Sequence, residues 1–172
     1  MTYITEPIKY GSVEYSIIAM GEIAPFQLVT VGAQVSGQVK KLHIIRGQKV
    51  SKGELIAEID STTQLNELNS QRALLKNYQA QLAARKIALD VARKKYDREF
   101  ALKRQDATSR ESFEAAQSAL ARATADAAEM QSLITRTEIS VKTADANLGY
   151  TKITAPINGT VLSVSVEEGQ TI

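Results

Sequence analysis

Two segments that lie far apart in the chain carry the same short pattern. Residues 33–50 align without a gap to residues 155–172, at an offset of 122 positions. The shared pattern is A-x-[VI]-[SN]-G-x-V, followed later by G-Q-x-[VI]. Alternating apolar residues and turn glycines predict short β-strands in both copies. Because a pair of strands is only marginally stable alone, we expect the two copies to fold against each other as one β domain with pseudo-twofold symmetry.

The first copy runs on into a further strand that the second copy lacks. Residues 53–60 read Gly-Glu-Leu-Ile-Ala-Glu-Ile-Asp, which predicts a strand, whereas the second copy stops at Ile172 before the matching position. We therefore expect the second half of the β domain to be incomplete. The same mismatch favours a truncated fragment of a longer protein.

The insert between the two copies has the pattern of a coiled coil. No Pro or Gly occurs from Thr62 to Leu148, so a helix can continue through most of this span. The first arm repeats a large apolar residue at every seventh position, at Leu68, Leu75, Leu82, Leu89 and Tyr96. The second arm alternates steps of three and four and is apolar at every position except Thr137, along Phe113, Ala116, Leu120, Ala123, Ala127, Met130, Ile134, Thr137, Val141, Ala144 and Leu148. These two ladders predict an antiparallel α-helical hairpin over residues 62–149, with arms of roughly 60 Å at 1.5 Å per residue.

The two arms should join near residues 105–109, where polar residues follow the end of the first ladder. Thr108 or Ser109 is suited to cap the second helix, with Glu111 or Ser112 in its first turn. The predicted fold class is therefore α+β, with a long antiparallel coiled-coil hairpin inserted between two halves of one β domain.

Charges are divided unevenly between the arms. Residues 72–104 hold ten Lys or Arg against three acids, and residues 110–147 hold four against six. The ordinary interpretation is a solvated surface with weak pairing between the arms, because each exposed ion pair contributes only ~0–1 kcal/mol. The alternative is that the positive arm meets the negative arm of a neighbouring copy.

Composition argues against several classes of function. A formal net charge of +2 is too small for a nucleic-acid-binding surface, so we expect no nucleic acid partner. The chain has no Cys and one histidine, His43, in a predicted strand where a lone histidine is usually structural. No glycine-rich phosphate loop is present, and Glu58 and Asp60 lack a partner base or metal ligands. We therefore predict no enzyme activity, no catalytic residue, no metal site and no cofactor.

The order of the elements resembles that of the periplasmic adaptors, or membrane fusion proteins, of tripartite efflux pumps in the HlyD-like family. The closest resemblance is to adaptors of the macrolide-efflux, MacA type: Val31–Gln38 and Asn147–Pro156 resemble their two lipoyl-half signatures. The resemblance implies that residues 31–61 and 150–172 are the two halves of a lipoyl-like domain. It also implies that residues 1–30 are leading β-strands of a membrane-proximal or β-barrel region.

The tip of the hairpin carries a further part of the resemblance. In this family the tip has an Arg, a Leu four residues on and a Ser seven residues beyond, and these residues contact the outer-membrane channel. Arg98, Leu102 and Ser109 match that spacing. Individually they fit a solvated charge, a seam leucine and a helix cap. Their joint match at the predicted tip implies a partner-binding site.

The resemblance also implies partners and a location. The adaptor forms a homo-oligomeric ring, a hexamer, between an inner-membrane ABC transporter (MacB-like) and a TolC-like outer-membrane channel. Such a protein lies in the periplasm and, in the full-length parent, is associated with the inner membrane. Within this chain, no apolar stretch reaches the ~20 residues that a membrane-spanning helix needs.

Three alternatives stand beside this interpretation. A type I secretion adaptor of the HlyD type shares the architecture but carries other cargo. A stand-alone coiled-coil scaffold accounts for the hairpin but not for the split repeat. A lipoyl or biotinyl carrier domain needs a lysine at the turn between its halves, and Ser61 follows Glu58-Ile59-Asp60 there instead.

Overall fold

The computed structural model describes residues 1–172, which fall into two units, residues 1–30 and 31–172. In the first unit no helix or strand forms and every residue is exposed. This corrects the expectation of leading strands. The segment makes no backbone hydrogen bond to a neighbour, and extended backbone becomes a β-strand only when it is paired. The assignment of residues 1–30 to a membrane-proximal or β-barrel region stays a prediction.

In the second unit, both repeat copies contribute strands to two small antiparallel sheets. In the larger sheet, β3 (Leu55–Ile59) lies between β1 (Val39–Leu42) and β4 (Lys152–Thr154). In the smaller sheet, β2 (Lys49–Val50) pairs with β5 (Gly159–Thr160). Because β4 and β5 follow the two helices and β1 to β3 precede them, each sheet needs the segments on both sides of the insert.

Hydrogen bonds between the two copies follow the 122-residue offset seen in the sequence. The bonds form matching pairs: Val39 N–H to the Gln170 carbonyl and Val161 N–H to the Gln48 carbonyl, both 2.9 Å, and Gly47 N–H to the Val161 carbonyl and Gly169 N–H to the Val39 carbonyl, both 2.8 Å. The two turn glycines have φ values of 85° and 87°, which glycine adopts without strain. The two copies are therefore related by a pseudo-twofold in structure as well as in sequence.

The interior of the β domain is small, and one glycine lies very close to a buried side chain in it. Its buried apolar residues are Val39, Ile44, Ala57, Ile59 and Ala155. A Cβ on Gly37 would lie 2.5 Å from Cγ2 of Ile59, whereas a Cβ on the equivalent Gly159 would meet nothing within 4 Å. Only the first of the two equivalent glycines therefore permits a close approach of backbone to side chain.

The strand predicted through His43 is shorter than expected. β1 ends at Leu42, and the backbone N–H of His43 still donates to the carbonyl of Ile56 at 2.8 Å. The His43 ring lies with Nε2 3.3 Å from Oε1 of Glu58 on the neighbouring strand. This histidine is thus part of the surface of the larger sheet.

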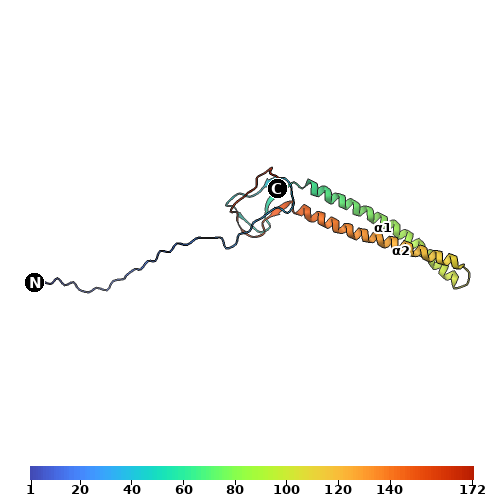
Figure 1. The fold of residues 1–172 in the computed structure, drawn as a ribbon, viewed down its shortest axis with the longest axis horizontal. Coiled ribbons are helices and arrows are strands. Elements are labelled where there is room, and N and C mark those ends of the chain that lie inside the picture. Colours follow the sequence, from blue (N-terminus) through green and yellow to red (C-terminus); the bar gives the residue numbers. More distant parts are fainter. The chain divides into compact units, whose positions relative to one another are not determined.

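The insert forms two long helices, α1 (Thr62–Lys103) and α2 (Arg110–Gly149), which run side by side in opposite directions (Figure 1). Every position of the two predicted ladders is buried or half-buried. A buried cluster in the middle of the seam consists of Leu82, Met130 and Ile134, with Leu75, Tyr78 and Leu133 packed against it. The single polar ladder residue, Thr137, is buried with its hydroxyl donating to the Leu133 carbonyl at 2.8 Å. The predicted coiled-coil hairpin is confirmed.

Charged residues add little to the pairing of the arms. Two ion pairs cross the seam, Arg72 with Asp145 at 3.4 Å and Arg85 with Asp126 at 3.5 Å. All four side chains stay exposed to solvent, so each pair contributes only ~0–1 kcal/mol. The apolar ladders, not the charges, hold the arms together.

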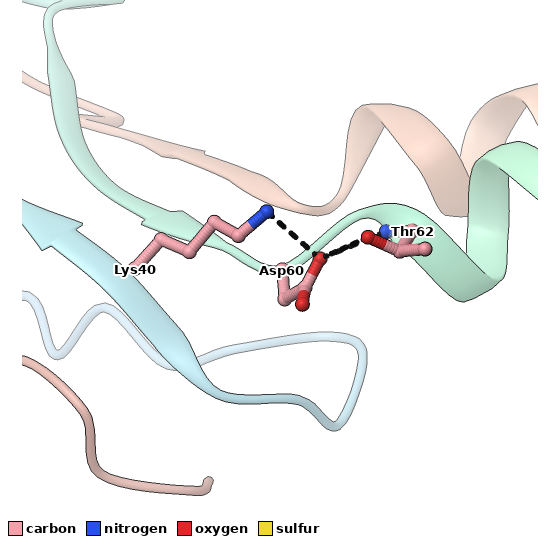
Figure 2. A network of polar contacts seen from close by, with 3 residues as sticks. All are labelled: Lys40, Asp60 and Thr62. Carbon is pink, nitrogen blue, oxygen red and sulfur yellow. Dashed lines mark hydrogen bonds and ion pairs between the residues drawn. The ribbon is translucent and has the colours of Figure 1, made fainter.

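The start of α1 is tied to the β domain by Asp60 (Figure 2). Asp60 Oδ1 accepts hydrogen bonds from the Thr62 hydroxyl at 2.7 Å and the Thr62 backbone N–H at 3.0 Å, and lies 3.1 Å from Nζ of Lys40. These interactions, those with Thr62 first, lower the pKa of Asp60 to about 2. Since Lys40 belongs to β1 and Thr62 begins α1, one carboxylate links sheet and helix.

The end of α2 is tied to the same sheet by Thr151. Its side chain is buried, with the hydroxyl donating to the Leu148 carbonyl at 2.7 Å. Its carbonyl accepts the N–H of Ile59, the last residue of β3, at 2.8 Å. The start of α1 and the end of α2 are thus both held by hydrogen bonds that lead into the larger sheet.

Candidate functional site

The tip of the hairpin is the turn at residues 104–109 together with the helix turns beside it. Hydrogen bonds shape the turn: the N–H groups of Gln105 and Ala107 donate to the Leu102 carbonyl at 3.0 and 2.9 Å. Asp106 N–H donates to the Lys103 carbonyl at 3.2 Å, and Asp106 itself has φ of 52°. Aspartate is one of the few residues other than glycine that tolerate this left-handed backbone. The turn therefore has a defined conformation that returns the chain after the last turn of α1.

Ser109 is the N-cap of α2. Its backbone is extended, with φ of −79° and ψ of 153°, and its hydroxyl oxygen accepts the N–H of Ser112 at 3.1 Å. The same hydroxyl donates to the Ser112 hydroxyl at 2.9 Å. In the first turn of α2, Arg110 Nε lies 2.7 Å from Oε1 of Glu114. Ser109 remains exposed while it satisfies one of the free N–H groups that begin every helix.

Aromatic rings replace the aliphatic seam near the tip. The Phe113 ring of α2 lies 5.6 Å from the Tyr96 ring and 6.4 Å from the Phe100 ring, measured between centroids. Tyr96 and Phe100 on α1 stack with centroids 6.1 Å apart. The ammonium of Lys103 sits 3.9 Å from the Phe113 centroid, which is within the range of a cation–π interaction. We call these four residues the aromatic clasp.

A hydrogen bond closes the other side of the turn. The Thr108 hydroxyl donates to Oε2 of Glu99 at 2.6 Å, and both residues are half-buried. The contact joins α1 to the residue before the N-cap of α2. A hydrogen bond to a charged group is stronger than a neutral one, so this contact fixes the turn against α1.

The three residues that the sequence singled out all lie at the surface of the tip. Arg98 is exposed and Leu102, one helical turn further on, is 40% exposed. Arg98 lines a shallow hollow of about 420 Å³ on α1, together with Val91, Lys94 and Asp97. Ser109 lines a different hollow of about 500 Å³, which is formed by both arms. Arg98 and Leu102 therefore share one stretch of α1, and Ser109 belongs to a separate part of the tip.

Sequence reasoning did not identify the contacts that shape the tip. Tyr96 and Phe113 were assigned to the seam, but Phe100, Lys103 and the Glu99–Thr108 contact were not singled out. A usable signal was present, since two of the three phenylalanines in the chain flank the turn.

Elsewhere, the side chains offer little chemistry. No three His, Cys, Asp or Glu side chains come together in a way that suits a metal ion. Neither helix is long and apolar enough to cross a membrane. The tip combines exposed cations, an exposed leucine and hydroxyls that are hydrogen-bonded within the hairpin, and its chemistry is that of binding.

Comparison with known proteins matches most of the chain to one described family. The family profile described as "RND MFP, barrel-sandwich hybrid domain" matches residues 27–172. The pyoverdine export membrane fusion protein PvdR of Pseudomonas aeruginosa is 38% identical over 168 residues, which are 98% of this chain and 43% of PvdR. The macrolide export protein MacA of Escherichia coli O157:H7 is 34% identical over 171 residues, which are 99% of this chain and 46% of MacA.

A solved structure agrees with these matches. The crystal structure of MacA from Actinobacillus actinomycetemcomitans has a TM-score of 0.82 to this chain at 53% identity, over 86% of this chain and 45% of that one. The resemblance inferred from the β half-motifs and the hairpin is confirmed. The chain spans less than half the length of each of these three relatives.

Proposed function

The chain belongs to the membrane fusion protein family, and we propose that it is the hairpin and lipoyl-like part of a periplasmic adaptor in a tripartite efflux pump. In this proposal the adaptor bridges an inner-membrane ABC transporter (MacB-like) to a TolC-like outer-membrane channel. The relatives named above support it, since their names describe export of pyoverdine and of macrolides. Those names favour small-molecule efflux over protein secretion of the HlyD type.

The observation that carries the proposal is the surface of the tip. Two paired helices of 42 and 40 residues end in a turn that leaves Arg98, Leu102 and Ser109 open to solvent. In the proposal, Arg98 supplies a charge-assisted hydrogen bond, Leu102 an apolar anchor and Ser109 a hydroxyl to the channel. Packing between the two helices does not depend on these three side chains, so they are available to contact a partner.

The remaining parts of the proposal concern assembly. The β domain is a lipoyl-like domain, and it packs with its copies in a hexameric ring in the periplasm. The charge difference between the arms is compatible with contact between neighbouring hairpins. The protein acts by joining and sealing its partners, without catalysing a reaction.

A cross-linking experiment tests the proposal. The chain has no Cys, so Ser109→Cys introduces a single thiol at the tip, and Ala84→Cys places one at an exposed position in the middle of α1 as the control. With a purified TolC-like channel in its open form, we expect cross-links from the tip variant only. Cross-links from neither variant of a folded chain would refute channel docking, and equal cross-links from both would refute docking by the tip.

A further inference from the structure

The docking residues lie on two different elements, and something must hold them in a fixed relation. Leu102 is in the last turn of α1, and Ser109 caps the first turn of α2. Their relative position depends on how the two helix ends are joined. A binding surface made of two independent segments binds more tightly when the segments are ordered beforehand, because less conformational entropy is lost on binding.

The aromatic clasp joins these two helix ends. Phe113 lies in the first turn of α2 and contacts the rings of Tyr96 and Phe100 on α1, with centroids 5.6 and 6.4 Å away. Phe113 is half-buried, and its contacts with the Tyr96 and Phe100 rings form within the hairpin without a partner. Aromatic rings keep a preferred mutual geometry, which a seam of alanine and leucine does not impose.

The clasp also extends to the turn itself. Lys103 caps the Phe113 ring at 3.9 Å and is the residue directly after Leu102. The Leu102 carbonyl accepts the N–H groups of Gln105 and Ala107. The backbone path of the turn is therefore held at Leu102, directly beside Lys103. A shift of Phe113 away from α1 would therefore move the N-cap of α2 and loosen the turn.

We propose that Phe113, with Tyr96, Phe100 and Lys103, acts as a positioning group that preorders the tip for docking to the channel. This inference rests on the proposed function. Its residues need not touch the channel, because their effect passes through the backbone of Leu102 and Ser109. Loss of the clasp should leave the hairpin helical, while the turn samples other conformations and docking becomes weaker.

The test measures two quantities on the same variants of the full chain. Amide hydrogen exchange at Gln105 and Ala107 reports the order of the turn, and affinity for a purified TolC-like channel reports docking. We expect Phe113→Ala to speed exchange at both amides and to weaken binding roughly tenfold, equivalent to about 1.4 kcal/mol. Phe113→Tyr keeps the ring, so amide exchange in the turn and affinity for the channel should both match those of the unaltered chain. Lys103→Gln should have a smaller effect in the same direction.

The control is Leu89→Ala, which removes a half-buried seam residue of α1 away from the turn. It should lower the stability of the hairpin but leave both tip measurements unchanged. The inference is overturned if Phe113→Ala leaves turn exchange or affinity unaltered, or if Leu89→Ala weakens binding equally. Failure of the unaltered chain to bind the channel would refute the proposed function, and the exchange data would then decide alone whether the clasp orders the turn.

Discussion

The base and the tip of the hairpin are held in different ways. At the base, α1 and α2 are anchored to the β domain: Asp60 bonds to Thr62 and Lys40, and Thr151 connects α2 to β3. At the tip, only the hairpin's own side chains and turn hydrogen bonds are present. The base is therefore built for a fixed attachment, and the tip leaves its outer surface free for a partner.

This comparison predicts which property each group of substitutions should change. Changes at the base should alter the free energy of unfolding and spare the docking surface. Changes at the tip should alter docking and have little effect on global stability.

The largest effect is expected for a charge placed in the docking surface. Leu102→Asp should weaken channel binding roughly a hundredfold or more, since a charge buried without a partner costs about 3–5 kcal/mol. Ser109→Arg should act similarly through steric bulk. Both should keep the helical circular dichroism signal, and a loss of that signal would instead mark the residues as structural.

The matched control for this change lies at the base. Leu65 on the first turns of α1 is 45% exposed, close to the 40% of Leu102. Leu65→Asp should leave channel affinity unchanged. Equal losses from the two leucines would break the distinction between base and tip.

The next largest effect is expected in the β domain, where Gly37 lies close to Ile59. Gly37→Ala would drive a Cβ to within 2.5 Å of Ile59 Cγ2, and Ile59 is only 3% exposed. Overpacking of this kind costs about 1–3 kcal/mol of unfolding free energy. Urea denaturation measures it. Gly159→Ala, at the equivalent open position, should change stability by less than about 0.5 kcal/mol, and similar losses in both variants would contradict the packing difference.

A smaller effect is expected for the cap at the tip. Ser109→Ala removes the acceptor for the Ser112 N–H and should destabilise the start of α2 by about 1 kcal/mol. Faster amide exchange in the first turn of α2 should report this change. Ser118→Ala, at an exposed position within α2, is the control and should leave exchange unaltered. An unchanged first turn in Ser109→Ala would show that the cap is dispensable.

The smallest effect is expected from titration of Asp60. Its pKa in the folded chain is about 2, below the ordinary 3.8, so the ionised carboxylate favours the folded state. That contribution is present above pH 3.8 and is lost as the pH falls toward 2. The stability advantage of the natural chain over Asp60→Asn should therefore shrink across that window in urea denaturation. An advantage that is constant or grows on acidification would contradict the role of Asp60 at the base.

Much of the second unit could be predicted because its pattern is periodic. Leu68 to Tyr96 and the ladder from Phe113 to Leu148 repeat over many turns, so errors at single residues do not change the result. The split repeat likewise pointed to the pairing of strands on both sides of the insert. Periodicity does not specify individual contacts, however. Phe100 lies outside the ladders, and the Glu99–Thr108 contact depends on the shape of the turn.

Two other features show what a single sequence leaves out. Gly37 and Gly159 are equivalent in the repeat, yet only Gly37 faces a buried side chain, that of Ile59 in β3. Residues 1–30 have apolar residues typical of strands, but a strand forms only where backbone groups find a partner. In both cases the structure depends on packing and pairing partners and not on the local preference of the residues.

The central claim is that the partner docks on the tip and not on the base. Amide hydrogen exchange of the chain with and without a purified TolC-like channel tests it most directly. We predict slower exchange confined to the residues around the turn, from Arg98 to Ser112, with the amides near Asp60 and Thr151 unchanged. Slower exchange along the base or the middle of the arms, with the tip unaffected, would contradict the claim.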